Sequence, residues 1–238
     1  MRKNKKLNYK NFILKVFPYK SPFERKHFGP VTNFIKVFAL RSAFILYRIG
    51  ITANLLDLAA ICLIIPGFSY LYLGIFSMKL NYIIFGYLTL AFVLFIDFVD
   101  GSLARIHPFI FKVGNDLDNL PPDILRIGSI IMIGIIANNI FMVSTALCCA
   151  IILNMYGPNT IKSIPEKSNW ILLLAGTRMS LTGIRLLVGF ILPLNSYIFY
   201  LNKILGSMLA SILVIIYAFI SLSWIILTLN DKTIRHKT

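Results

Sequence analysis

Long apolar runs, each ended by a short polar break, dominate the sequence from about residue 50 onward. A helix that crosses a membrane needs about 20 mainly apolar residues. Six runs are near this length, and they lie at residues 52–76, 82–106, 118–138, 140–157, 170–194 and 206–229. The pattern predicts an all-α integral membrane protein with six transmembrane helices.

The breaks between these runs differ in strength. Lys79 with Asn81 separates the first pair, and Asn138–Asn139 alone separates the third from the fourth. Longer polar stretches, YGPNTIKSIPEKSN at 156–169 and NSYIFYLNK at 195–203, are expected to separate the fourth run from the fifth and the fifth from the sixth.

The segment before the first run has a different pattern. In residues 30–50 the apolar positions are interrupted by Lys36, Arg41 and Arg48. Such a pattern is typical of an amphipathic helix that lies in the membrane interface. The alternative is that this segment extends the first membrane-spanning helix.

Positive charge is concentrated at one end of the chain and on one side of the predicted bundle. The formal net charge is +15, and residues 1–50 hold twelve of the 24 Lys and Arg residues but only one acid, Glu24. With six spans, the basic N-terminus, the 105–112 and 156–169 loops and the tail share one side, whereas the other side receives only Lys79 and Lys203. Lys and Arg are enriched in cytoplasmic loops, so both termini are predicted to be cytoplasmic.

The predicted organisation is therefore a basic cytoplasmic segment (1–29), a six-helix membrane domain with its interfacial helix (30–230) and a cytoplasmic tail (231–238). The basic lead-in favours anionic lipid headgroups as its partner over nucleic acid, because no base-stacking or groove-reading module accompanies it. No signal peptide is expected, and Cys62, Cys148 and Cys149 lie in apolar runs as packing residues.

Five of the nine acidic residues fall between residues 97 and 123, at the predicted cytoplasmic edge of the membrane. Charged residues at membrane depth usually serve a function. Asp97 and Asp100 are three residues apart, which places both on one face of a helix, where a divalent cation would relieve their repulsion. Oxygen-only ligands suit Mg²⁺, Mn²⁺ or Ca²⁺. The alternative is a helix end with solvated charges, and for Asp116 a solvated loop residue is the expected role.

The spacing of these residues resembles the signature of the CDP-alcohol phosphotransferase family, D-x2-D-G-x2-A-R-x8-G-x3-D-x3-D. The matching positions are Asp97, Asp100, Gly101, Ala104, Arg105, Gly114 and Asp118. The stretch IGITANLLD at 49–57 also looks like the segment that opens the family's first membrane helix. Six spans after an interfacial helix are similar to the family's layout.

The last position of the signature departs from this pattern. Residue 122 is proline, and Asp123 follows one residue late. On a regular α-helix this shift turns Asp123 by about 100° from the expected direction. A one-residue bulge at Leu120–Pro121–Pro122 would restore the direction, and we expect one there. Alternatively, the third span begins at the prolines and leaves Asp118 in a loop.

The resemblance implies a reaction and a set of roles. Asp97, Asp100, Asp118 and Asp123 would bind Mg²⁺ or Mn²⁺, with Asp123 also acting as general base. The nucleotide of a CDP-linked lipid donor would lie at Gly101, Ala104 and Gly114, and Arg105 would contact phosphate. A phosphatidyl or other substituted phosphate group would pass to a small or lipid alcohol acceptor, and CMP would leave. The family also implies a homodimer. The charge bias of the loops, for its part, predicts an active site at the cytoplasmic face.

Three arginines within or near apolar segments, Arg126, Arg178 and Arg185, are candidate ligands for an acceptor's phosphate. Pairing with helix ends or with the acids is the alternative. Two other readings of the whole chain stay open. One is a non-catalytic family member without a positioned base. The other is a transporter, although transporter sites usually lie near the bilayer midplane.

Overall fold

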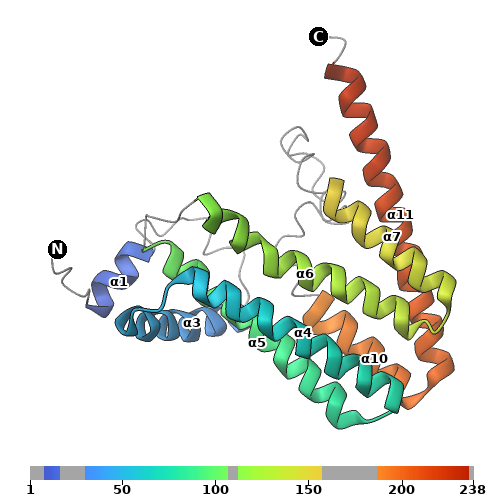
Figure 1. The fold of residues 1–238 in the computed structure, drawn as a ribbon, viewed down its shortest axis with the longest axis horizontal. Coiled ribbons are helices and arrows are strands. Elements are labelled where there is room, and N and C mark those ends of the chain that lie inside the picture. Colours follow the sequence, from blue (N-terminus) through green and yellow to red (C-terminus); the bar gives the residue numbers. More distant parts are fainter. Residues whose placement is uncertain (1–7, 17–29, 107–111, 157–186, 236–238) are drawn as a thin grey trace. The chain divides into compact units, whose positions relative to one another are not determined.

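The computed structural model describes residues 8–16, 30–106, 112–156 and 187–235, and every regular element in these ranges is a helix (Figure 1). In chain order the elements are α1 (Tyr9–Val16), α3 (Pro30–Ile49), α4 (Ala53–Ser77), α5 (Leu80–Ala104), α6 (Lys112–Ile136), α7 (Ile140–Tyr156), the π-helix η2 (Leu187–Ile191), α10 (Leu192–Leu201) and α11 (Lys203–Arg235).

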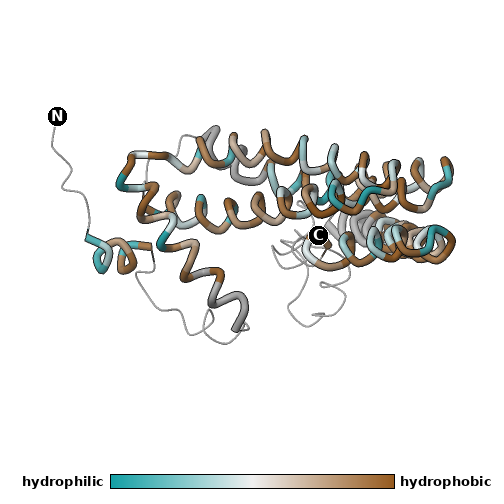
Figure 2. Tube along the Cα trace, turned by 90° about the horizontal axis from the view of Figure 1, so that it is seen from below, coloured by the Kyte–Doolittle hydropathy of each residue, from teal (hydrophilic) through white to brown (hydrophobic). Residues whose placement is uncertain are grey.

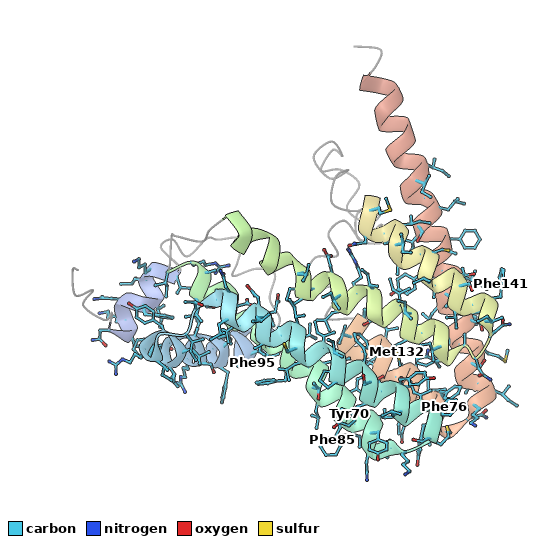
Figure 3. The ribbon with its side chains drawn as sticks, viewed as in Figure 1. Tyr70, Phe76, Phe85, Phe95, Met132 and Phe141 are labelled. Carbon is cyan, nitrogen blue, oxygen red and sulfur yellow. The ribbon has the colours of Figure 1, made fainter. Side chains whose placement is uncertain are left out.

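Three of the described helices are long and apolar enough to cross a membrane: Ala53–Ser77, Leu80–Ala104 and Lys203–Ser223. Two shorter apolar helical segments, Ile140–Met155 and Leu187–Leu201, accompany them. Large apolar side chains project outward from these helices. Phe76 of α4 and Phe85 of α5 are 80% and 59% exposed (Figure 3). An all-helical membrane protein is thus supported. The count of six spans stays a prediction, because most of the expected fifth span lies outside the described residues.

Two of the expected breaks between helices coincide with local backbone features. The α4–α5 turn contains Met78 at φ 53°, and the α6–α7 turn contains Asn138 at φ 54°. Asparagine adopts this left-handed conformation more readily than most residues. Asn139 then accepts a hydrogen bond from the Phe141 N–H at 2.9 Å, as a helix N-cap does. The weak Asn138–Asn139 break is therefore a true helix boundary.

The expected break at 195–203 is wrong in extent, because α10 continues to Leu201 and only Asn202 connects it to α11. The polar residues at its start, Asn195 and Ser196, are buried. Ser196 accepts a hydrogen bond from the Tyr87 hydroxyl at 2.7 Å. Asn202 makes the turn, since its side chain accepts hydrogen bonds from the N–H groups of Ile204 and Leu205 at 3.1 and 3.2 Å.

Contacts divide the chain into two compact units, residues 1–64 with 91–121 and residues 65–90 with 122–238. The core of the first unit is formed by α1, α3 and the last turns of α5. Its buried members are Phe12, Val16, Ala39, Ala43, Val99, Leu103 and Ile106. This packing positions the turns of α5 that carry Asp97 and Asp100.

In the second unit, helices approach closely where glycines replace larger residues. A Cβ on Gly86 of α5 would lie 2.8 Å from the backbone N of Leu71 and 2.9 Å from the carbonyl O of Gly67 on α4. Small residues of this kind let membrane helices pack backbone to backbone. At the other end of this unit, Ser207 of α11 donates a hydrogen bond to the Ala137 carbonyl at 2.7 Å.

Candidate functional site

The last turns of α5 hold the first two acids of the signature. Apolar neighbours Val99 and Leu103 are 2% and 0% exposed in the core of the first unit, so the helix is fixed in rotation about its axis. Asp100 is consequently buried, with 3% exposure, and Asp97 is half-buried. Each of the two acids has a polar or electrostatic partner. A carboxylate buried at this depth is stable only with a cation, a proton or hydrogen-bond donors beside it.

Gly101 follows directly and faces open space. Among the described residues, a Cβ built on Gly101 would meet no atom within 4 Å. Packing within this part of the chain therefore does not require a glycine here, in contrast to Gly86. Ala104 is half-buried and Arg105 is exposed at the end of the helix. This end of α5 can accommodate a phosphate ester with a divalent ion. Two acids suit the ion, the open space at Gly101 leaves room for the ester, and Arg105 suits phosphate.

The third acid of the signature lies on α6, whose first described residue is Lys112. Gly114 and Asp118 both belong to this helix, although their side chains lie outside the described part of the structure. The alternative in which the span begins at the prolines is therefore wrong, because Asp118 is helical and does not lie in a loop.

The bulge expected at Leu120–Pro121–Pro122 is also not present, since the backbone stays α-helical through both prolines. Pro121 and Pro122 are the tenth and eleventh residues of α6, beyond the first turn, so each removes an N–H that a regular helix would use in an i→i−4 hydrogen bond. The regular helix leaves Asp123 turned by about 100° from the direction of residue 122.

Asp123 instead takes part in a polar network with Arg126 and Asn154, all in the second unit. Nη2 of Arg126 donates to Oδ1 of Asp123 and to Oδ1 of Asn154, each at 2.8 Å. The Arg126 side chain is 4% exposed and the Asp123 side chain 37%. Within the part of the chain that the structure describes, the buried Nε of Arg126 has no hydrogen-bond partner. The network holds one oxygen of Asp123 and links α6 to α7.

Two polar residues of the described structure, Asn154 and Asp57, were not expected from the sequence, and two expected acceptor ligands cannot be placed. Arg178 and Arg185 lie outside the described residues. Asn154, which the sequence reading passed over, was detectable as a lone amide in an apolar span. Asp57 was also passed over. It is 2% exposed near the start of α4, in the same unit as Asp97 and Asp100, and lies at the end of the IGITANLLD stretch.

Among the side chains that the structure describes, no three His, Cys, Asp or Glu residues are grouped as a metal site. Asp97 and Asp100 supply two carboxylates of the type that hard divalent ions prefer. The side chain of the third acid, Asp118, lies outside the described part of the structure. The donor chemistry and the open space at Gly101 fit a divalent ion with a bound phosphate ester. The described residues alone form only part of its coordination.

The sequence model of the CDP-alcohol phosphatidyltransferase family matches residues 50–230. This range includes every position of the signature and Asp57, Arg126 and Asn154. No curated protein and no solved structure is similar enough to this chain to count as a match. The family match, independent of the three-dimensional arrangement, supports the resemblance drawn from the spacing of the acids.

Proposed function

Because the chain belongs to the CDP-alcohol phosphatidyltransferase family, we propose that it makes phospholipids by transferring a substituted phosphate group from a CDP-alcohol to an acceptor alcohol. The proposed donor is a CDP-linked lipid such as CDP-diacylglycerol, and the leaving group is CMP. The observation that carries this proposal is the end of α5. There Asp100 is 3% exposed, Asp97 lies one turn earlier, and Gly101 faces open space.

Members of this family generally depend on a divalent metal. Asp97, Asp100 and Asp118 would hold the ion, Mg²⁺ or Mn²⁺, by their carboxylate oxygens. When bound, such an ion neutralises charge on the phosphates and makes CMP a better leaving group. In this proposal the cytidine nucleotide lies against Gly101, Ala104 and Gly114.

The protein's own groups provide the remaining chemistry. Arg105, at the exposed end of α5, would bind a phosphate oxygen of the donor. Asp123 would take the proton from the acceptor hydroxyl with the carboxylate oxygen that Arg126 does not hold. The acceptor oxygen then forms a bond to the donor phosphorus, and the bond from phosphorus to the CMP oxygen breaks. The product is a phosphodiester that joins the two alcohols.

Arg126 has two roles in this proposal. Its Nη2 orients Asp123, and its guanidinium is the proposed contact for an oxygen of the acceptor. Arg178 and Arg185 are proposed as further acceptor ligands. We further propose a homodimer with its active site at the cytoplasmic face. For these two features the support is the family and the charge asymmetry of the loops.

A second candidate is a family member that has lost catalysis. It is favoured by one observation, the regular α-helix at Pro121–Pro122, which leaves Asp123 out of the signature's direction. The two candidates differ in what Asp123 does. A positioned base typically contributes 10²–10⁴-fold to the rate, so its loss is measurable.

The test is CMP release by the purified full-length chain from CDP-diacylglycerol with Mg²⁺ or Mn²⁺. The acceptors would be glycerol 3-phosphate, inositol, inositol phosphate, serine and choline. Metal-dependent release with one acceptor, reduced at least about a hundredfold in Asp123→Asn, would support the proposal. Release that is unchanged in this variant would exclude Asp123 as the base. No release with any acceptor from folded protein would favour the non-catalytic candidate.

A further inference from the structure

The short helix α1 has two sides of opposite character. Phe12 and Val16 are 0% and 2% exposed, whereas Lys10 and Leu14 are exposed on the opposite side and Lys15 is exposed at the edge of the buried side. Figure 2 shows hydrophilic and hydrophobic residues on this one short helix. Its buried side and its lysine side can therefore have different partners.

The buried side of α1 is held mainly by aromatic rings of α3. The Phe12 ring lies 5.3 Å from Phe44 and 5.6 Å from Tyr47, and the Tyr9 ring lies 5.1 Å from Phe44. Edge-to-face contacts at these distances are favourable. An isolated helix of eight residues is not stable in water, so α1 exists as a helix only while it is docked.

The core on which α1 docks includes the end of α5. Phe12 and Val16 share it with Val99 and Leu103, which lie on either side of Asp100 in the sequence. Packing in protein interiors is close enough that removing one member is felt by the others. The docking of α1 therefore contributes to holding the turn of α5 that carries the buried carboxylate.

The exposed sides of α1 and α3 are basic and partly apolar. Residues 8–16 and 30–50 contain no Asp or Glu. On α3, Arg41 is exposed close to Phe38 and Ile45, which are 56% and 57% exposed. Basic residues interleaved with exposed apolar side chains fit an anionic membrane surface, where headgroups meet the charges and acyl chains the apolar groups.

From these contacts we infer that α1 is a lipid-responsive strap. Anionic headgroups bound by Lys10 and Lys15 hold α1 in its docked position and so stabilise the acid-bearing end of α5. Near an anionic surface each lysine gains about 1 kcal/mol, so it can change the docking equilibrium by at most about fivefold. The regulatory part, in which activity rises with anionic lipid, rests on the proposed function, whereas the docking part does not.

The test compares the full-length chain in nanodiscs of phosphatidylcholine with and without phosphatidylglycerol. Hydrogen–deuterium exchange of residues 9–16 reports docking, and CMP release is measured in the same samples. The variant Lys10→Gln/Lys15→Gln removes the charges without touching the buried side. Its matched control, Lys79→Gln/Lys203→Gln, removes two exposed lysines at other helix ends.

Phosphatidylglycerol should protect residues 9–16 of the wild type and the control by roughly tenfold or more, and the α1 double variant should lose this response. Phe12→Ala should expose residues 9–16 in both lipids. Equal protection in both lipids, or an unchanged response in the double variant, would overturn the strap. Lipid-dependent protection without CMP release would contradict the proposed function alone. CMP release without lipid-dependent protection would contradict the strap alone.

Discussion

Arg126 donates a 2.8 Å hydrogen bond to Asp123 three residues earlier on α6, and the arginine is the buried member of the pair. Because the Asp123 carboxylate is partly exposed, its bond to the buried Arg126 guanidinium should orient the carboxylate more than it stabilises the fold. Arg126→Leu should therefore cost only about 1–2 kcal/mol of stability, because Asp123 can still be solvated. CMP release should fall at least tenfold, mainly in kcat. Thermal unfolding and steady-state kinetics test this, and a large loss of stability with normal kcat would contradict it.

Asn154 should influence the Asp123 carboxylate indirectly, through Arg126. Its Oδ1 accepts from the Arg126 atom that also holds Asp123, so its loss leaves Arg126 with Asp123 as its one partner among the described residues. Asn154→Leu should lower kcat less than Arg126→Leu does, and the double variant should be no worse than Arg126→Leu alone. A double-mutant cycle on kcat checks this. Additive losses would show that the two residues act independently.

Gly101 and Gly86 lie on the same helix, but their substitutions should have opposite effects. Alanine at Gly101 would meet no described atom within 4 Å and is a better helix former, so the fold should become more stable by up to about 1 kcal/mol. Its methyl group would nevertheless occupy the proposed donor site and reduce CMP release.

Alanine at Gly86 would collide with the backbone of α4 and should destabilise the fold by about 1–3 kcal/mol. Thermal unfolding of the two variants, with donor KM for Gly101→Ala, measures the difference. A Gly101→Ala variant with unchanged KM would place the donor elsewhere.

Removal of metal should stop the reaction without unfolding the protein. Asp100→Asn keeps the shape of a buried side chain and removes its charge, so the fold should persist. Its activity should fall by on the order of a hundredfold or more, because several kcal/mol of charge stabilisation are lost. Chelation should have the same effect on the wild type, and added Mg²⁺ or Mn²⁺ should reverse it. Activity that survives chelation would exclude a metal at these acids.

The sequence predicted the helical class and most boundaries because these depend on local features. Asn138 is an example, since the turn needs a residue that tolerates a positive φ. The break at 195–203 failed because Asn195 and Ser196 are polar but buried, and the tertiary partner Tyr87 explains only the position of Ser196. The same holds for Asn154, whose hydrogen bond spans 28 residues.

The region around the prolines shows the limit for the candidate site. Local propensity favoured a bulge or a helix start at Pro121–Pro122, yet α6 continues through both. The local preference is strong, since a proline inside a helix costs about 3 kcal/mol, and the structure gives no local reason for the unbroken helix. The spacing of Asp97, Asp100 and Asp118 indicated the family. The pairing of Asp123 with Arg126 was not predicted, because it depends on whether α6 stays regular through Pro121–Pro122.

Because α6 is a continuous helix, the residue inserted before Asp123 also sets the direction of Arg126, which links α6 to α7 through Asn154. A variant that lacks Pro122 would regain the family's spacing between the third and fourth acids. It would also rotate every later residue of α6 by about 100° relative to the start of the helix and shift it by about 1.5 Å. Arg126 would then face away from Asn154, unless the first turns of α6 rotated instead. Restoring the signature at one position thus disconnects the helix from its neighbour at another.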